Sequence, residues 1–371
     1  MTENPVTPDQ VQPRPVVARL PKYAAGKPPT VVQGLTPFKL SSNEIPFGPL
    51  ESVSQAVLAQ SNLNRYPDPL STKLRDALSD YLDVPAEDIV TGAGSLGALT
   101  QILNTFAGQN EDGIQDEVIY AWRSFEAYPI VVQSAGALPV AIPLLADGRH
   151  DLESMIASVN ENTSVILLCT PNNPTGPVLT QAEVDDFLDR VPKNVLVVLD
   201  EAYVEFVRDE KSVDGIHTYN ENENVVLLRT FSKAHGLANL RVGYSVAHPS
   251  ITNYLRVMAT PFAVSSVAED AAVASLEHID EVLERVESLV QERQRVVAAL
   301  ADQGWNLPST QANFVWLPLG KRTAEFVERA NERALSVRGF ANEGVRVSIG
   351  EVDANDRFIE LCRESRDLAD S

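Results

Sequence analysis

Short apolar runs alternate with longer segments of helical periodicity through the middle of the chain. Several runs consist of Val, Ile and Leu without polar alternation, which is typical of strands buried on both faces of a parallel sheet. The expected strands are residues 88–91, 118–121, 140–143, 165–169, 195–199, 225–228 and 242–246. Helices are expected at residues 50–60, 70–82, 95–106 and 180–190. This pattern predicts an α/β fold with a central, mostly parallel sheet.

The last third of the chain has a different pattern. Residues 266–300 contain neither Pro nor Gly and predict one continuous helix, whose apolar face includes Val273, Leu276, Val282 and Leu283. Strands at 313–317 and 345–349 then alternate with helices at 323–335 and 355–367. We therefore expect a large domain at 70–265 and a small α+β domain at 266–371, with residues 22–69 packing on the small domain.

Residues 1–21 carry five prolines among polar residues. This composition predicts an extended or disordered N-terminal arm.

The 371-residue chain is strongly acidic, with 51 acidic and 30 basic residues and a net charge of −21. Nucleic acid and anionic membrane surfaces would repel such a chain, so we expect neither as a partner. The sequence has no apolar run long enough for a membrane span and no signal-peptide pattern. Two cysteines, Cys169 and Cys362, make no disulfide framework, which favours a reducing, cytoplasmic location. An anionic ligand would need a few well-placed arginines.

A Gly-x-Gly-x-x-Gly turn at residues 92–97 follows an expected strand and opens a helix. Glycines let backbone N–H groups approach a phosphate at the positive end of a helix. Three interpretations stay open: a dinucleotide site with Asp116 or Glu117 as its acid, a plain turn, or another phosphate cradle to which Ser95 adds a hydroxyl.

Polar residues follow two buried strands. Asn173 lies in a Pro-rich loop after the strand at 165–169, where it is either a turn former or a fixed donor to a ligand. Asp200 ends the strand at 195–199, where it is either a helix N-cap or a ligand-binding acid. Tyr203, three residues on, can return to the same place.

Lys233 follows the next strand, in a chain with only eight lysines. A poorly solvated ammonium has a lowered pKa, and the neutral amine can form a Schiff base with a carbonyl. The alternative is a lysine that extends from the strand end to water. Ser232 and Arg241 suit a phosphate group. A Schiff-base lysine, an acid for a pyridinium nitrogen and a phosphate subsite are together what pyridoxal phosphate requires.

Three motifs resemble those of the class I/II aminotransferases of fold type I: Asn-Asn-Pro-Thr-Gly at 172–176, Asp-Glu-Ala-Tyr at 200–203, and Ser-Lys-x-x-x-Leu-Ala-x-x-Arg-x-Gly at 232–243. Segments 40–49, 64–68 and 345–350 resemble the histidinol-phosphate aminotransferase branch and its aromatic relatives. The resemblance covers essentially the whole chain from Tyr23. It implies a large mixed, mostly parallel sheet domain that binds pyridoxal 5′-phosphate, a smaller α+β domain, and a homodimer in which residues 22–69 also meet the partner.

The resemblance also implies residue roles around the cofactor. Lys233 would hold the cofactor and move the proton between the substrate α-carbon and cofactor C4′. Asp200 would pair with the pyridinium nitrogen, and Tyr203 and Asn173 with the phenolic oxygen. Phosphate ligands would be Ser95, the Leu96 backbone N–H, Ser232, Arg241 and, from the neighbouring subunit, Tyr66. Phe125 would stack on the ring, unless it is an ordinary core residue.

For the substrate, the resemblance assigns Arg346 to the α-carboxylate, with Asn43 nearby. Tyr23 and Arg338 match positions that line the side-chain pocket. No metal site is expected.

One departure concerns the substrate. Histidinol-phosphate enzymes commonly have Gly-Ser-Asp-Glu at the first phosphate turn, whereas residues 94–97 here are Gly-Ser-Leu-Gly. The aromatic branch resembles this variant and also shares the stretch at 122–128. We therefore expect transfer from phenylalanine, tyrosine or tryptophan to 2-oxoglutarate, with histidinol-phosphate transamination as the alternative and a pyridoxal lyase or decarboxylase as a further one. A regulatory protein on the same scaffold is disfavoured, because Lys233 is intact and the charge is wrong for DNA.

Overall fold

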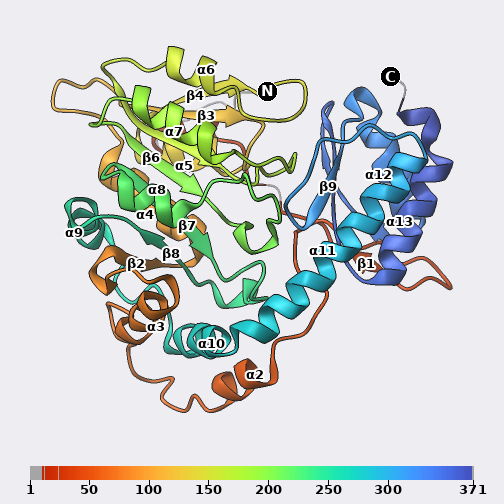
Figure 1. Cartoon of the computed structure of the whole chain (residues 1–371), viewed down its shortest axis with the longest axis horizontal. Coiled ribbons are helices and arrows are strands. Elements are labelled where there is room, and N and C mark those ends of the chain that lie inside the picture. Colours follow the sequence, from red (N-terminus) through yellow and green to blue (C-terminus); the bar gives the residue numbers. More distant parts are fainter. Residues whose placement is uncertain (1–10, 12, 24, 370–371) are drawn as a thin grey trace.

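A computed structural model describes residues 11, 13–23 and 25–369. Its larger body is built on a seven-stranded sheet with the order β2-β8-β7-β6-β5-β3-β4, seen on the left of Figure 1. Among the described strands of this sheet, β8 alone runs in the opposite direction: it pairs antiparallel with β2 and β7, and all other pairs are parallel. This confirms the predicted mostly parallel α/β architecture. The strands are β2 (Ile89–Gly92), β3 (Glu117–Trp122), β4 (Leu138–Pro143), β5 (Thr163–Cys169), β6 (Leu196–Asp200), β7 (Val225–Thr230) and β8 (Gly243–Val246).

Helices cover both faces of this sheet, which explains why its strands lack polar alternation. Val198 points to one face, into a core with Leu99 and Leu255, whereas Val197 and Leu199 point to the opposite core. The first face carries α4 (Gly94–Phe106), α5 (Tyr128–Ala135) and α9 (Pro249–Met258). The opposite core includes α3 (Thr72–Leu82), α6 (Leu152–Ala157), α7 (Gln181–Arg190) and α8 (Gly215–Glu221).

The carboxyl ends of β5, β6 and β7 meet at one edge of the sheet. Cys169 is in register with Asp200, and Asp200 with Leu228. The loops that follow these strands therefore bring Asn173, Asp200 and Lys233 to the same edge, where open α/β sheets bind ligands.

The smaller body holds a three-stranded antiparallel sheet with the order β11-β12-β9. Its strands are β9 (Phe314–Leu317), β11 (Arg338–Phe340) and β12 (Gly344–Ser348), and its helices are α12 (Thr323–Glu332) and α13 (Val352–Glu364). The N-terminal segment joins this body through β1 (Phe38–Lys39), which pairs in parallel with β10 (Leu335–Ser336). In Figure 1, α11 (Ile279–Asp302) runs diagonally from the larger body to the smaller one.

The continuous helix expected over residues 266–300 is wrong at one point. His278, with φ −119° and ψ 36°, separates α10 (Ser266–Glu277) from α11. The His278 Nδ1 donates to the Ala274 carbonyl at 2.9 Å, and Asp280 and Glu281 complement the new helix N-terminus. Because α10 packs against α2 (Glu51–Leu58) and α3, the domain boundary at residue 265 stays a prediction.

Other boundaries differ slightly. The helix expected at 323–335 ends at Glu332, because Ala334 has a φ of +55° and Leu335 enters β10. The helix expected at 355–367 begins and ends earlier, as α13. Short 3₁₀ turns occupy Ala86–Asp88, Val204–Phe206, Ala238–Leu240, Gly320–Arg322 and Arg366–Leu368.

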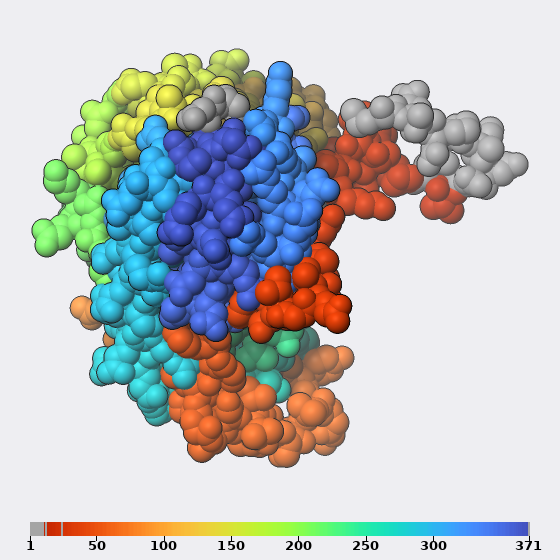
Figure 2. Space-filling model, turned by 90° about the vertical axis from the view of Figure 1, so that its right-hand side faces the viewer, coloured from red at the N-terminus to blue at the C-terminus, as the bar shows by residue number. Residues whose placement is uncertain are grey.

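The predicted N-terminal arm lies outside the described residues at positions 1–10 and 12. Its described part contains a short helix, α1 (Pro15–Arg19), rather than extended chain alone. The red N-terminal residues project from the body at the right of Figure 2. Across the described ranges, no helix is both long and apolar enough to cross a membrane.

Candidate active site

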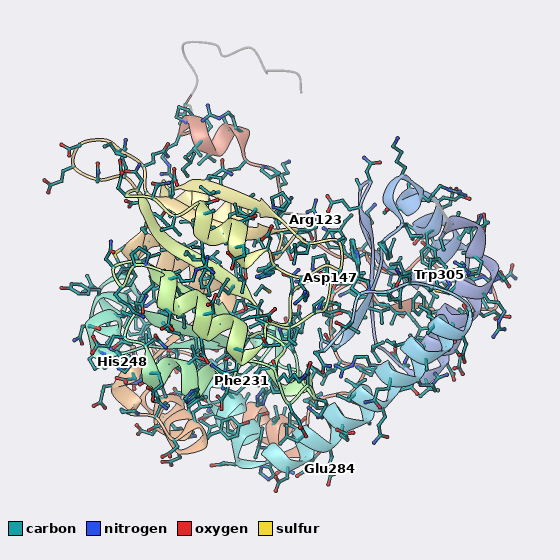
Figure 3. The ribbon with its side chains drawn as sticks, turned by 45° about the horizontal axis from the view of Figure 1, so that its top comes forward. Arg123, Asp147, Phe231, His248, Glu284 and Trp305 are labelled. Atoms are coloured by element: carbon teal, nitrogen blue, oxygen red, sulfur yellow. The ribbon has the colours of Figure 1, made fainter. Side chains whose placement is uncertain are left out.

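A cavity of about 320 Å³ lies where the carboxyl edge of the large sheet faces the small domain. In Figure 3, Arg123 and Asp147 lie on the large-body side that faces the small domain, and Trp305 lies across from them. The structure brings together all the predicted site residues except Tyr66. Those that line the cavity are Tyr23, Asn43, Ser95, Leu96, Phe125, Asn173, Asp200, Tyr203, Ser232, Lys233, Arg241, Arg338 and Arg346.

Lys233 lies in the cavity wall, three residues after β7 ends. Its Nζ donates to the Ser42 carbonyl at 3.2 Å and lies 5.7 Å from the centre of the Tyr203 ring. Burial, followed by the charges of Arg346 and Arg241, lowers the pKa of Lys233 to about 7. A substantial fraction of this amine is therefore neutral and nucleophilic near neutral pH.

Asp200 is held at the end of β6 by a partner that sequence reasoning missed. The Tyr128 hydroxyl donates to Asp200 Oδ2 at 2.7 Å, and the tyrosine is fully buried. Asp200 Oδ1 is buried without a hydrogen-bond partner among the described residues. Burial raises the pKa of Asp200 to about 6, while the bonds from Tyr128 and the Ala202 N–H oppose that rise. The carboxylate is thus oriented and has one oxygen left for a cationic donor.

Arg346 lies on β12 of the smaller body and contacts the larger body. Its Nη1 donates to Asn173 Oδ1 at 2.6 Å and its Nη2 to the Ser41 carbonyl at 2.8 Å. In the part of the chain that the structure describes, its Nε has no partner and no carboxylate pairs with the guanidinium. Because arginine only donates, Asn173 must turn its oxygen toward Arg346, which leaves the amide N–H₂ as a donor to the cavity.

Asn43 links the N-terminal segment to Tyr203 and to Ser348 of β12. Its Nδ2 donates to the Tyr203 hydroxyl at 2.9 Å, and its backbone N–H donates to Ser348 Oγ at 2.8 Å. Burial raises the pKa of Tyr203, so the phenol stays protonated and can donate onward.

The first turn of α4, together with Arg241, forms a part of the cavity wall that is suited to bind an anion. Ser95 and Leu96 lie in the first turn of α4, where free backbone N–H groups and the helix dipole favour negative charge. Arg241 donates to Ser232 Oγ at 3.4 Å and to the Ala238 carbonyl at 2.8 Å. A Cβ on Gly243 would lie 2.5 Å from the Ser95 nitrogen, so the glycine lets β8 approach this turn.

The dinucleotide interpretation of this turn does not hold. The preceding strand, β2, pairs antiparallel with β8 and has, among the described strands, no parallel partner such as a dinucleotide fold requires. Asp116 instead accepts a hydrogen bond from the Gly108 N–H at 2.9 Å.

Aromatic rings and one ion pair form the remaining wall. The Tyr23 and Phe125 rings meet edge to face with centroids 6.4 Å apart, and Phe340 also lines the cavity. Arg338 Nη2 donates to both carboxylate oxygens of Glu126 at 2.8 Å. Glu126 is a second residue of the site that sequence reasoning missed.

Tyr66 lies elsewhere on this subunit. The residue is 83% exposed, and its ring stacks on Phe262 with centroids 4.6 Å apart. Among the residues that the structure describes, Tyr66 is not one of those that line the cavity.

The residues present fit pyridoxal phosphate. The unpartnered Asp200 Oδ1 suits a ring N–H⁺, the amine of Lys233 suits an aldehyde, and the α4 turn with Arg241 suits a phosphate. The ring nitrogen, the aldehyde and the phosphate of the cofactor thus each have a complementary group in one cavity.

A sequence model of the family described as "Aminotransferase class I and II" matches residues 36–360. The chain therefore belongs to the class I and II aminotransferases, is an enzyme that acts on amino acids and 2-oxo acids, and uses pyridoxal 5′-phosphate.

Individual proteins similar to this chain carry more specific names than the family does. The chain is 51% identical to an aromatic amino acid aminotransferase of Streptomyces avermitilis over 94% of this chain and 95% of the relative. It is 46% identical to an aromatic amino acid aminotransferase of Mycolicibacterium smegmatis over 94% of each chain. Its fold is similar to the histidinol-phosphate aminotransferase of Sinorhizobium meliloti in complex with pyridoxal-5′-phosphate, with a TM-score of 0.83 and 28% identity over 95% of this chain and 97% of that one.

Proposed function

We propose that this enzyme transfers the amino group of phenylalanine, tyrosine or tryptophan to 2-oxoglutarate. The observation that carries the proposal is the side-chain wall of the cavity, where Tyr23, Phe125 and Phe340 gather and Arg338 is already neutralised by Glu126. Such a wall favours a neutral ring over a phosphate ester. The names of the relatives at 44–51% identity support the same substrate class.

Bound pyridoxal phosphate supplies an aldehyde that exchanges with the amino group and a ring that accepts the electron pair left at the substrate α-carbon. In this proposal, Lys233 would hold the cofactor through its aldehyde carbon and would carry the proton between the α-carbon and C4′. Its pKa of about 7 suits both roles, since the amine can give and take a proton near neutral pH. Asp200 Oδ1 would accept a hydrogen bond from the ring N–H⁺ and would keep that nitrogen protonated.

The family resemblance assigns the remaining cofactor contacts, and the presence of these residues in the cavity wall supports them. The Tyr203 hydroxyl and the Asn173 amide would donate to the phenolic oxygen. Phe125 would stack on the ring. The phosphate ligands are Ser95, the Leu96 N–H, Ser232 and Arg241.

For the substrate, Arg346 binds the α-carboxylate. Its guanidinium is buried and unpaired among the described residues, so a bidentate carboxylate would satisfy it. Asn43 fixes the neighbouring Tyr203 hydroxyl, and Tyr23 and Arg338 line the pocket for the substrate side chain.

We further propose a homodimer in which Tyr66 reaches the cofactor phosphate of the neighbouring subunit. The exposure of Tyr66 and its distance from its own cavity support this role. Hybrid dimers of a Tyr66→Phe subunit and a Lys233→Ala subunit test it. In such hybrids the intact Lys233 and the intact Tyr66 lie on different subunits but serve the same site, so that Lys233-containing site should regain the wild-type cofactor affinity that Tyr66→Phe homodimers lose. Equal affinity in all dimers would contradict it.

A single-turnover experiment tests the reaction. Holoenzyme mixed with phenylalanine and no acceptor should form about one equivalent of phenylpyruvate per subunit and release no CO₂. The Lys233→Ala variant should form none. CO₂ release would indicate a decarboxylase, and no product from any aromatic donor would contradict the proposal. We propose a cytoplasmic location, which the two free, buried cysteines support.

A further inference from the structure

Two arginines face each other on the small sheet. Arg338 of β11 is in register with Arg346 of β12, and like charges directly opposite on an antiparallel pair destabilise each other. Burial lowers the pKa of Arg346, the charge of Arg338 adds to this lowering, and the carboxylate of Glu126 opposes it. Glu126 therefore acts on both guanidiniums, although it bonds to only one of them.

The cavity thus contains two cationic positions in different states. Arg346 has no carboxylate partner among the residues described, whereas Arg338 is engaged by both oxygens of Glu126. The two proposed substrates differ in the same way. An aromatic amino acid carries one carboxylate, and 2-oxoglutarate carries a second at the end of its side chain.

We propose that Glu126 determines specificity by standing in for that second carboxylate. With an aromatic substrate, Glu126 stays on Arg338 and the pocket presents a neutral pair beside the ring. With glutamate or 2-oxoglutarate, the substrate carboxylate replaces Glu126 on Arg338. This inference rests on the proposed function, since it concerns the two substrates of that one reaction.

The position of Glu126 allows such an exchange. It lies in the connection between β3 and α5, outside regular structure, and its side chain is 24% exposed against 13% for Arg338. A displaced Glu126 carboxylate can therefore reach water, whereas Arg338 stays in the wall over Phe340, 5.4 Å from the ring centre. A phosphate ester in the same pocket would bring about two negative charges toward Glu126, which disfavours it.

The test is Glu126→Gln, which keeps the shape of the side chain and removes the competing charge. We expect the KM for 2-oxoglutarate to fall about tenfold and kcat/KM for phenylalanine to change less than about threefold. Histidinol phosphate should become a better donor than in the wild type. An unchanged ratio of kcat/KM for 2-oxoglutarate to kcat/KM for phenylalanine would overturn the inference.

The matched control is Glu343→Gln. Glu343 pairs with Arg123, three residues before Glu126, and joins the same two bodies without lining the cavity. It should leave the substrate ratio unchanged. A ratio that shifts equally in both variants would mean that any lost contact between the bodies has this effect, and would also overturn the inference.

Equilibrium binding to the holoenzyme separates charge exchange from catalysis. Glutarate and 3-phenylpropionate carry two carboxylates and one, respectively, and neither can react. Calorimetry should show that Glu126→Gln tightens glutarate about tenfold and that Arg338→Met weakens it, with 3-phenylpropionate little changed by either. Equal effects on both ligands would contradict the exchange. A wild type that binds glutarate but forms no phenylpyruvate would refute the proposed function instead.

Discussion

The contact between Tyr128 and Asp200 leads to a prediction that separates tuning of a carboxylate from simple packing. Tyr128→Phe removes one hydroxyl from a fully buried ring and leaves the ring in place. A hydrogen bond to a charged group contributes about 1.5–3 kcal/mol. Since one pKa unit corresponds to about 1.4 kcal/mol, the pKa of Asp200 should rise by about one to two units from its value of about 6.

The pKa of Asp200 rises, and does not fall, because the ionised carboxylate is the form that loses a hydrogen-bond donor. A higher pKa leaves more of Asp200 protonated at pH 7, where it cannot keep the cofactor nitrogen protonated. We expect the rate of the phenylalanine half-reaction to fall by about 2–10-fold at pH 7, and to recover largely by pH 9. Stopped-flow measurement between pH 6 and 9 tests this shift of the acid limb.

Tyr120→Phe is the matched control, because its ring lies 5.8 Å from that of Tyr128 in the same aromatic cluster and it has no bond to Asp200 in the structure. It should leave the pH profile unchanged. A Tyr128→Phe rate that falls equally at every pH would indicate a packing defect and refute the reasoning.

Three further predictions concern the surrounding residues. Burial raises the pKa of Glu205 from 4.5 to about 7. Between these two pH values the folded state holds a proton that the unfolded state has lost, so the free energy of unfolding falls as the pH rises from about 4.5 to about 7. Urea unfolding of the apoenzyme should therefore show Glu205→Gln more stable than the wild type at pH 8, by up to about 3 kcal/mol, with the difference vanishing toward pH 4.5. Arg346→Lys should raise the KM of every amino and 2-oxo acid by about 10²-fold in steady-state assays, because one ammonium cannot replace the bidentate fork, and an unchanged KM would remove Arg346 from the carboxylate site. Gly243→Ala should weaken pyridoxal phosphate binding at least tenfold by fluorescence titration, since its Cβ would lie 2.5 Å from the Ser95 nitrogen, whereas Gly48→Ala meets open space and should bind normally.

Much of the site could be predicted because its residues follow consecutive strands of one sheet. Asn173, Asp200 and Lys233 come directly after apolar runs, and parallel strands place their carboxyl ends together. The motif at 232–243 likewise predicts Ser232 and Arg241, which both line the cavity and share a hydrogen bond.

Contacts between distant segments could not be predicted from the pattern. Tyr128 is 72 residues from Asp200, and Glu126 is 212 residues from Arg338. Neither pairing leaves a local signal, because each depends on how the connection after β3 packs against other elements. The break at His278 was not predicted because the local sequence favours a helix on both sides of it. The change of direction between α10 and α11 arises from their packing against two different bodies.

Competition between two donors tests the central claim most directly. With purified holoenzyme, 2-oxoglutarate as acceptor, and phenylalanine and histidinol phosphate at equal concentration, the ratio of phenylpyruvate to the imidazole-containing oxo product equals the ratio of the two kcat/KM values. An aromatic pocket with Arg338 covered by Glu126 predicts a ratio of at least about ten in favour of phenylpyruvate. A ratio below one would contradict aromatic specificity and assign the enzyme to histidinol phosphate.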